Sequence, residues 1–205
     1  MRARDLMSAP VVTVTPWAPA KEAAEVLSEN GFTALPVVDD DERLIGIVTE
    51  ADLIRERVPA DVRSGHLDPD TRAAAADVTV RDVMTTPVTA MSSGTDVADL
   101  CQALVDARIR AMPIADGSRL VGIVTRGDVV RVLAREDSAI AADVRHRLEI
   151  YGGTGRWKVQ VRDGVVRIVD RYDDETDRHV ATLLALAVPG VVGADTISSG
   201  EDPWS

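Results

Sequence analysis

The chain has 205 residues, of which 45% are hydrophobic and 28% charged, a composition typical of folded globular proteins and not of disordered ones. Its formal net charge of −11 argues against nucleic-acid binding over the whole surface, because phosphates require clustered Lys and Arg. Aromatic residues make up only 3%, so a purine bound here is expected to contact aliphatic side chains and backbone rather than stacked rings. The length corresponds to one or two domains.

The cysteine content and the N-terminal sequence bear on the compartment. Cys101 is the only cysteine, so no internal disulfide can form, and a reducing compartment suits the sequence. The first residues lack the apolar stretch of a signal peptide. No stretch approaches the roughly 20 apolar residues of a membrane span. These features predict a cytoplasmic protein.

An internal repeat dominates the first two thirds of the chain. When residues 4–39 are laid over 81–116, and 43–55 over 119–131, 17 positions are identical. Both copies contain Arg-Asp-x-Met-x-x-Pro-Val, a helical stretch, an Ala-x-Pro strand and Arg-Leu-x-Gly-Ile-Val-Thr-x-x-Asp. Because each copy is too small to bury a sheet alone, the two are expected to pack on each other.

Each copy is predicted to fold in the order β-α-β-β-α. Its first helix is expected from apolar residues at helical spacing, more clearly in the second copy than in the first. These residues are Val97, Leu100, Cys101, Leu104 and Val105, and Ala23, Ala24 and Leu27. Gly31 is expected to end the earlier helix with a positive φ. Buried strands are predicted at 35–38 and 44–48 around a turn at 39–42, and second helices follow at Glu50 and Arg126.

The copies are assigned to residues 1–58 and 78–136, and a connector to residues 59–77. The connector contains Pro59, Gly65 and Pro69, followed by the run Arg72–Ala76. It is longer than a usual connection, which favours a loop with a short helix that covers one cleft.

Residues 137–200 carry a third pattern, with the predicted order α-β-β-α-β. The first helix is expected from Ile140, Val144 and Leu148, and it ends at Gly152 and Gly153. Strands at 157–162 and 165–171 flank Asp163-Gly164, a strong hairpin signal. The last two elements are a helix with an apolar face, closed by Pro189-Gly190, and a strand at 191–197. The apolar face consists of Val180, Leu183, Leu184 and Ala187.

The hairpin turn predicts the register, with Arg162 opposite Val165 and Val159 opposite Ile168. The helix-facing side then holds Trp157, Val159, Val161, Val166 and Ile168. The outer side holds cations beside Val165 and Val169. These cations are Lys158, Arg162, Arg167 and Arg171. Residues 145–171 carry seven Lys or Arg and three Asp or Glu, a net +4. A solvated face, a protein-docking face and a face for anionic lipid are the three alternatives.

The repeated motif identifies a family. The paired units resemble cystathionine-β-synthase (CBS) domains, two of which form a Bateman module that commonly binds adenosyl ligands between the repeats. The strongest matching residues recur in register. They are Met7, Pro10, Pro36 and Gly46–Asp52, and Met84, Pro87, Pro113 and Gly122–Asp128. The resemblance covers roughly residues 1–135 and implies an α+β fold with the repeats related by a pseudo-two-fold axis, and a homodimer.

Each Thr-x-x-Asp has two compatible explanations. The Thr can cap the first turn of a helix while the acid bonds back to it. The Asp carboxylate can also accept both hydroxyls of a ribose, while the Thr hydroxyl and the helix N-terminus face a phosphate.

The resemblance implies that each cleft combines the Thr-x-x-Asp of one repeat with the helix start and strand of the other. The first cleft would use Thr49 and Asp52 with Thr95, Ile109, Arg110 and Ala111. The second would use Thr125 and Asp128 with Ala18, Phe32, Thr33 and Ala34. We rank the first higher, because Thr95 keeps a hydroxyl where the second has Ala18 and because Arg110 suits a phosphate. Thr95 as a plain N-cap and Arg110 as a solvated charge are the alternatives.

The C-terminal pattern, with Val-x-Val-x-x-Gly-Val-Val and a later Pro-Gly-Val, resembles the BON domain, a module proposed to bind phospholipid in some envelope proteins. Asp170 stands where that family usually has a small residue. The resemblance implies a possible phospholipid or protein partner for the outer face.

No other candidate points to catalysis. His66, His146 and His179 lack metal-ligand spacing, Cys101 is expected to pack in the core, and no nucleophile-elbow or phosphate-loop motif is present. The predicted function is therefore a non-enzymatic sensor of AMP, ADP, ATP or S-adenosylmethionine, without a metal, a cofactor or a nucleic-acid partner. The alternative is a membrane-peripheral or interaction adaptor that uses the CBS pair as a dimerisation scaffold.

Overall fold

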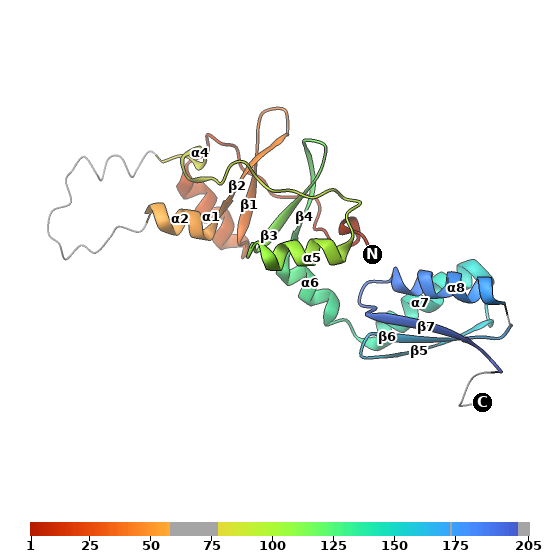
Figure 1. The fold of residues 1–205 in the computed structure, drawn as a ribbon. Helices are drawn as coiled ribbons and strands as arrows, with labels where there is room; N and C mark the ends of the chain where they lie inside the picture. The colour runs from red at the N-terminus through yellow and green to blue at the C-terminus, as the bar shows by residue number, and fades with distance from the viewer. Residues whose placement is uncertain (58–77, 173, 201–205) are drawn as a thin grey trace, which may run out of the picture. The chain divides into compact units, whose positions relative to one another are not determined.

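A computed structural model describes residues 1–57, 78–172 and 174–200 (Figure 1). The predicted connector, residues 59–77, and the proposed cover of a cleft lie outside these described residues. The chain divides into a unit of residues 2–126 and a unit that begins at Gly127 and also includes Met1. The division falls after the first residue of helix α6 (Arg126–Leu133), and just beyond this helix Arg135 Nη1 donates to Pro189 O at 2.6 Å.

The two repeats contain the same elements in the same order. The first consists of η1 (Ala3–Asp5), α1 (Ala20–Asn30), β1 (Ala34–Val38), β2 (Leu44–Thr49) and α2 (Glu50–Arg57). The second consists of α4 (Val80–Val83), α5 (Val97–Asp106), β3 (Ala111–Asp116), β4 (Arg119–Thr125) and α6 (Arg126–Leu133). The predicted helix-strand-strand-helix order is confirmed. The short helices η1 and α4 were not predicted from the sequence.

The first strand predicted for each repeat is reduced to an isolated parallel bridge, Val14 to Val37 and Met91 to Ile114. In the first repeat Val14 N donates to Pro36 O at 3.1 Å and Val14 O accepts from Val38 N at 3.1 Å. Pro10 and Pro16 stand on either side of this segment. Because proline has no N–H to donate, the pairing does not extend into a ladder.

The antiparallel pairs β1–β2 and β3–β4 share one register. Ala34 lies opposite Thr49, and Ala111 lies opposite Thr125. Each pair has one irregularity near the turn, between Val37 and Val38 in one and at the equivalent place in the other. The duplication therefore extends to the details of strand pairing.

Each repeat also adds a backbone bridge to the sheet of the other repeat. Ser8 pairs with Ile123, and its counterpart Thr85 pairs with Ile47. At both crossings a methionine packs over a glycine. A Cβ at Gly46 would lie 2.7 Å from Met84 Sδ, and one at Gly122 would collide with Met7 Sδ. The repeated Met and Gly are therefore required by the close approach of the two repeats.

Replacing Gly122 by alanine is expected to destabilise the repeat pair by about 1–3 kcal/mol, the usual cost of overpacking. The new Cβ would lie 2.7 Å from Met7 Cγ and 2.9 Å from Met7 Cβ, and the second of these atoms cannot move without the backbone. The midpoint of urea unfolding measures the effect. Gly94→Ala is the control, because its Cβ would meet no atom closer than 3.6 Å. Equal midpoints for the two variants would contradict this explanation of the repeated glycine.

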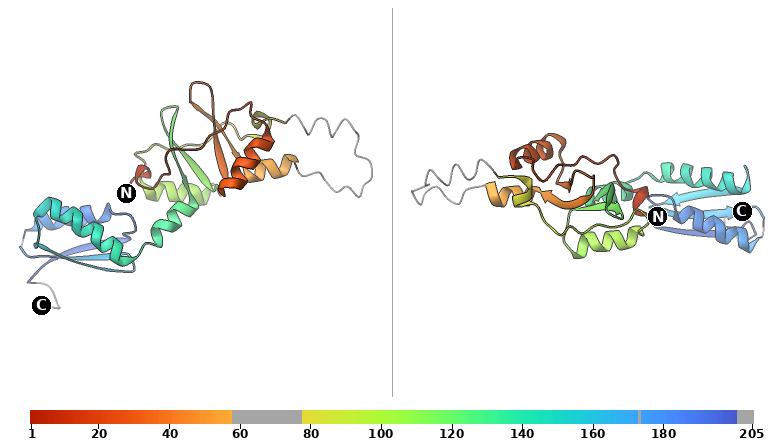
Figure 2. Two further views of the ribbon diagram at one scale, coloured as in Figure 1. Left: turned by 180° about the vertical axis from the view of Figure 1, so that it is seen from behind. Right: turned by 90° about the horizontal axis from the view of Figure 1, so that it is seen from above.

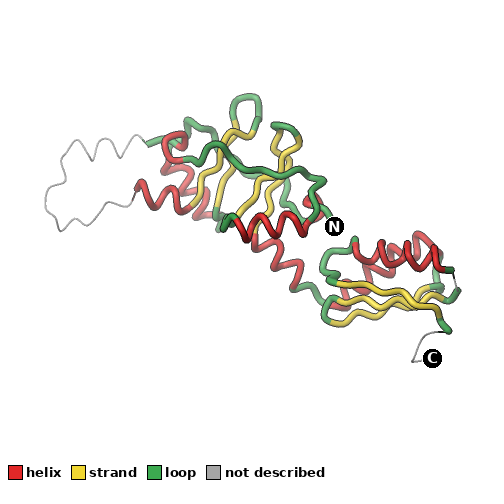
Figure 3. The backbone as a smooth tube through the Cα atoms, viewed as in Figure 1, coloured by secondary structure: helices red, strands yellow, loops and turns green. Residues whose placement is uncertain are grey.

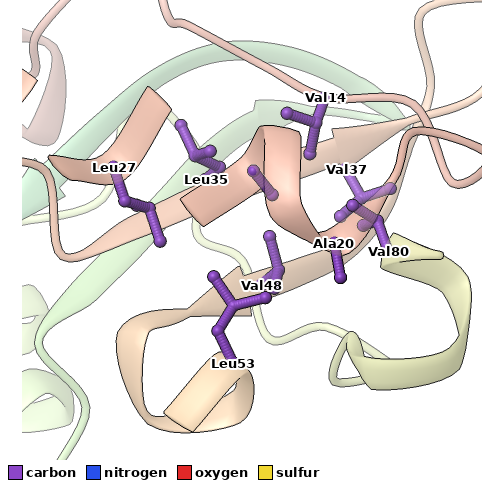
Figure 4. Packing of buried hydrophobic residues seen from close by; sticks show 9 residues of the cluster. Val14, Ala20, Leu27, Leu35, Val37, Val48, Leu53 and Val80 are labelled. Carbon is purple, nitrogen blue, oxygen red and sulfur yellow. The ribbon is translucent and has the colours of Figure 1, made fainter. Parts of the chain in front are cut away.

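The aliphatic core predicted from the composition is present in the first repeat (Figure 4). Helix α1 contributes three residues to it, β1 and β2 contribute three more, and the others come from neighbouring segments. The buried residues are Val14, Ala20, Ala23, Leu27, Leu35, Val37, Val48, Leu53 and Val80. Gly31 ends α1 with a φ of 65°, which confirms the predicted stop and turns the chain directly into β1.

The C-terminal unit has the predicted α-β-β-α-β order. It consists of α7 (Asp137–Gly152), β5 (Trp157–Arg162), β6 (Val165–Asp170), α8 (Glu175–Leu186) and β7 (Gly193–Ser198). The sheet order is β5-β6-β7, with β5–β6 antiparallel and β6–β7 parallel. Both helices cover the same face of this sheet (Figures 2 and 3). None of the helices in the described ranges has the length and apolar character of a membrane span.

The predicted hairpin register is confirmed residue by residue, from Trp157 opposite Asp170 to Arg162 opposite Val165. In the turn, the φ angles of Asp163 and Gly164 are 51° and 74°. The amides of both residues donate to the Asp137 carboxylate, at 2.8 and 2.9 Å. Trp157, Val166 and Ile168 are buried against the helices. The turn chemistry therefore determines which face meets the core.

Asp170 lies at the end of that inner face, and its environment differs from expectation. Its side chain is fully buried and accepts two hydrogen bonds from Arg156, at 2.7 and 2.6 Å. Arg156 also pairs with Asp177 at 2.7 Å and stacks over the Trp157 ring at 4.2 Å. Arg156, one of the seven cations counted in residues 145–171, is therefore an internal partner of two carboxylates.

Candidate ligand-binding site

A cavity of about 470 Å³ lies within residues 2–126, between the two repeats. This volume is within the range of sites for small molecules. Each repeat supplies about half of the residues that line it. The first repeat contributes Thr33, Ala34, Ile47, Thr49, Glu50, Ala51, Asp52 and Ile54. The second contributes Thr85, Pro87, Val88, Thr89, Arg108, Ile109, Arg110, Ala111 and Pro113. Aliphatic side chains line it, and none of these residues is aromatic.

Thr49 and Asp52 form a capping box at the start of α2. Asp52 Oδ2 accepts from Thr49 Oγ1 at 2.7 Å and from Thr49 N at 3.0 Å, and Asp52 N donates to Thr49 Oγ1 at 3.3 Å. Reciprocal bonds of this kind satisfy amides that the first helical turn leaves unpaired. The Thr49 hydroxyl therefore donates within the protein, and the idea that it faces a phosphate loses support.

The second oxygen of Asp52 is differently placed. Oδ1 meets Arg55 only at 4.0 Å, and the Arg55 side chain is 75% exposed. A carboxylate oxygen has two lone pairs, so Oδ1 has the capacity for both hydroxyls of a ribose while Oδ2 holds the helix cap. Capping and ligand binding are thus compatible in this one side chain.

The cavity wall also carries charge of both signs. Arg108 and Arg110 lie on either side of Ile109, between α5 and β3, whereas Glu50 stands at the start of α2. Arg110 Nη1 lies 3.6 Å from Glu50 Oε2. The Arg110 side chain is 73% exposed and has this ionic contact, so both roles considered for it, a solvated charge and a phosphate contact, stay predictions.

Most residues predicted for the first cleft line this cavity, but Thr95 does not. Its carbonyl accepts from Ala3 N at 2.8 Å, and the N-cap of α5 is Asp96, whose carboxylate accepts from Ala98 N at 2.9 Å. The capping role considered for Thr95 is therefore taken by Asp96, and a ligand role for Thr95 stays a prediction. Asp96 takes the cap because it directly precedes α5 and its carboxylate reaches the amide of Ala98, the second residue of the helix.

Two residues predicted for the other cleft, Thr33 and Ala34, line the same cavity, because β1 begins beside the end of β2. The segment from Thr85 to Thr89 was missed altogether. The repeated Met-x-x-Pro-Val is the sequence signal that marks this segment.

The remaining residues of the second set are dispersed among other environments. Ala18 and Phe32 pack against the core of the first repeat. Thr125 ends β4 opposite Ala111. Asp128, in α6, is 7% exposed, and its Oδ1 pairs with Arg131 at 2.9 Å. The second cleft stays a prediction.

Other candidate side chains have ordinary surroundings. His146 and His179 are exposed, and His66 lies outside the described residues. Cys101 is half-buried in α5, and this burial raises the pKa of its thiol, which favours the unreactive protonated form. In the part of the chain that the structure describes, no three His, Cys, Asp or Glu side chains are grouped as metal ligands.

The comparisons with known proteins agree with this geometry. An uncharacterized protein of Methanopyrus kandleri is 33% identical over 123 residues, which are 60% of this chain and 57% of that protein. Among solved structures, CBSX2 in complex with AMP has a TM-score of 0.54 at 29% identity, over 63% of this chain and 93% of that one. The CBS domain pair of MJ0100, in complex with 5-methylthioadenosine and S-adenosyl-L-methionine, has a TM-score of 0.52 at 25% identity, over 64% and 94%.

The family model of the CBS domain matches residues 3–58 and 80–135. These ranges coincide with the two repeats and account for more than half of the chain. Residues 136–205 lie outside the match. The chain therefore belongs to the CBS domain family and carries a pair of CBS domains.

Proposed function

We propose that this protein is a non-enzymatic sensor that binds an adenosyl ligand in the cavity between its CBS domains. The observation that carries the proposal is Asp52, whose Oδ1 is free of the helix cap on the wall of an aliphatic cavity. Two structural neighbours bind AMP or S-adenosylmethionine, which supports the same ligand class here. Ile47, Ile54 and Val88 would contact the purine, and Asp52 would accept the ribose hydroxyls.

Calorimetric titration with AMP, ADP, ATP and S-adenosylmethionine tests the proposal. At least one of them is expected to bind, and at a concentration of 100 times its Kd it should stabilise the folded protein by about 2.7 kcal/mol. A thermal-shift series gives the second measurement. The absence of heat at millimolar ligand, with protein shown to be folded by circular dichroism, would overturn the proposal.

The outer face of the β5-β6-β7 sheet supports a second proposal, an adaptor role for the BON-like unit. Lys158, Arg162 and Arg167 are exposed on that face beside Val165, and the helices cover only the opposite face. Arg171 is exposed just beyond β6. Asp195 of β7 lies opposite Arg167 in the sheet and adds one negative charge to this face. Cosedimentation with anionic and neutral vesicles at two salt concentrations tests this role, since a binder of phospholipid should pellet only with the anionic vesicles and at low salt.

Homodimerisation and a cytoplasmic location also remain proposals. The first follows from the family resemblance and the second from the cysteine content. Sedimentation equilibrium and fractionation of cells that express the protein measure them.

A further inference from the structure

The cationic side of the cavity has an unusual backbone. Arg108 has a φ of 54°, the left-handed conformation that Gly31 adopts at the equivalent position of the first repeat with a φ of 65°. Glycine adopts this conformation without a steric penalty, whereas a residue with a side chain does so at a cost. At this position the second repeat therefore carries a guanidinium group at the cavity in place of the more easily accommodated glycine.

The acidic side comes from the other repeat. Glu50 and Asp52 both stand in the first turn of α2, and both line the cavity. Glu50 Oε2 lies 3.6 Å from Arg110 Nη1, with side-chain exposures of 47% and 73%. This ion pair joins the first repeat to the second across the cavity wall.

The duplicated positions show that the pair is specific to this cavity. Where the first repeat has Glu50, the second has Arg126, and where the second has Arg110, the first has Thr33. The symmetry-related positions thus carry no acid that could hold a cation in the same way. The Arg126 side chain instead donates to Leu104 O at 2.7 Å.

We propose that Glu50 is the internal counter-ion of Arg110, which an anionic group of the ligand must displace, and that Glu50 thereby determines how strongly the cavity favours a phosphorylated over an unphosphorylated adenosyl ligand. The inference rests on the proposed function. Glu50 Oε2 lies beside Arg110 Nη1, and a guanidinium group attracts carboxylate and phosphate alike, so the two compete for the positive charge of Arg110. A phosphate that displaces Glu50 also leaves that carboxylate nearby, which further opposes binding.

The test compares the Kd of AMP with the Kd of adenosine by calorimetry. The proteins are the natural chain, Glu50→Gln, Arg110→Gln and the double variant. Glu50→Gln is expected to raise the preference for AMP over adenosine by a factor of about two to five, the range that exposed ion pairs contribute, because the Kd of AMP should change more than the Kd of adenosine. Arg110→Gln is expected to remove most of the preference. In that background Glu50→Gln should have a smaller effect, because only the repulsion between the Glu50 carboxylate and the phosphate is left to remove.

Glu25→Gln is the matched control, because Glu25 pairs with Lys21 on the exposed surface of α1, away from the cavity lining. It should leave both Kd values unchanged. An AMP preference that is unchanged by Glu50→Gln, or an equal change for adenosine, would overturn this inference while leaving the proposed function intact. If neither AMP nor adenosine binds the natural chain, the proposed function fails and this inference fails with it.

Discussion

Replacing Asp52 by alanine is expected to weaken the binding of AMP by about 10- to 100-fold. The variant removes the carboxylate oxygen that would accept the ribose hydroxyls, and hydrogen bonds to a charged group contribute about 1.5–3 kcal/mol each. Calorimetry gives the Kd, and 2′-deoxyadenosine monophosphate separates the ribose contact from the rest. The natural chain should discriminate against the deoxy ligand, and Asp52→Ala should not.

Asp128→Ala is the matched variant at the duplicated position. Asp128 Oδ1 already pairs with Arg131 at 2.9 Å, whereas Asp52 Oδ1 meets Arg55 only at 4.0 Å. We therefore expect the smaller loss for Asp128→Ala, and equal losses would refute the ranking of the two Asp residues. Because Asp52→Ala also removes a helix cap, which costs about 0.5–2 kcal/mol, the stability of each variant has to be measured alongside its Kd.

Replacing Asp170 by alanine is expected to destabilise the C-terminal unit by about 3–5 kcal/mol. The Asp170 side chain is fully buried, and that of Arg156 is 12% exposed, so the variant leaves a guanidinium group with one of its two carboxylates missing. Removing one partner of a buried pair has this effect because the other charge remains desolvated. Amide hydrogen exchange of β5 and β6 in the full chain measures the loss.

Asp195→Ala is the control, since Asp195 is exposed on the outer face of the same sheet. The double variant Arg156→Met, Asp170→Leu should recover much of the stability, because an apolar pair can replace a buried ion pair of similar volume. A loss of the same size for Asp195→Ala, or no loss for Asp170→Ala, would contradict the structural role of the pair.

The same network makes stability depend on pH. Hydrogen bonds from Tyr151 and Arg156 hold the pKa of Asp177 below its usual value. A carboxyl group with a lowered pKa contributes stability that is complete above its unfolded pKa of about 3.9 and is lost as the pH falls through the folded value. Acid below that range should therefore loosen the contact between α7 and α8, where Tyr151 meets Asp177 at 2.7 Å.

The features that were predictable from the sequence are local or repeated. Asp163-Gly164 determines the hairpin register because a two-residue turn with positive φ allows only one pairing. Gly31 ends α1 because the αL conformation is easy for glycine. The Thr49–Asp52 cap requires only residues within one helical turn. The internal repeat predicts that the two copies contain the same helices and strands at matching positions.

Only the tertiary structure decided which residues meet across the sequence. Thr85, Pro87, Val88 and Thr89 line the cavity because the second repeat crosses the sheet of the first. Thr95 is not among the lining residues, and Asp96 caps α5 in its place. Arg156 and Asp170 are separated by a hairpin, so no periodicity marks them as a buried pair. Turns, caps and faces depend on neighbours in the chain, whereas the cavity and the ion pairs depend on packing between distant segments. The sequence by itself therefore determined the order of the duplicated elements and the register of the C-terminal hairpin, and the packing of the repeats decided the composition of the site.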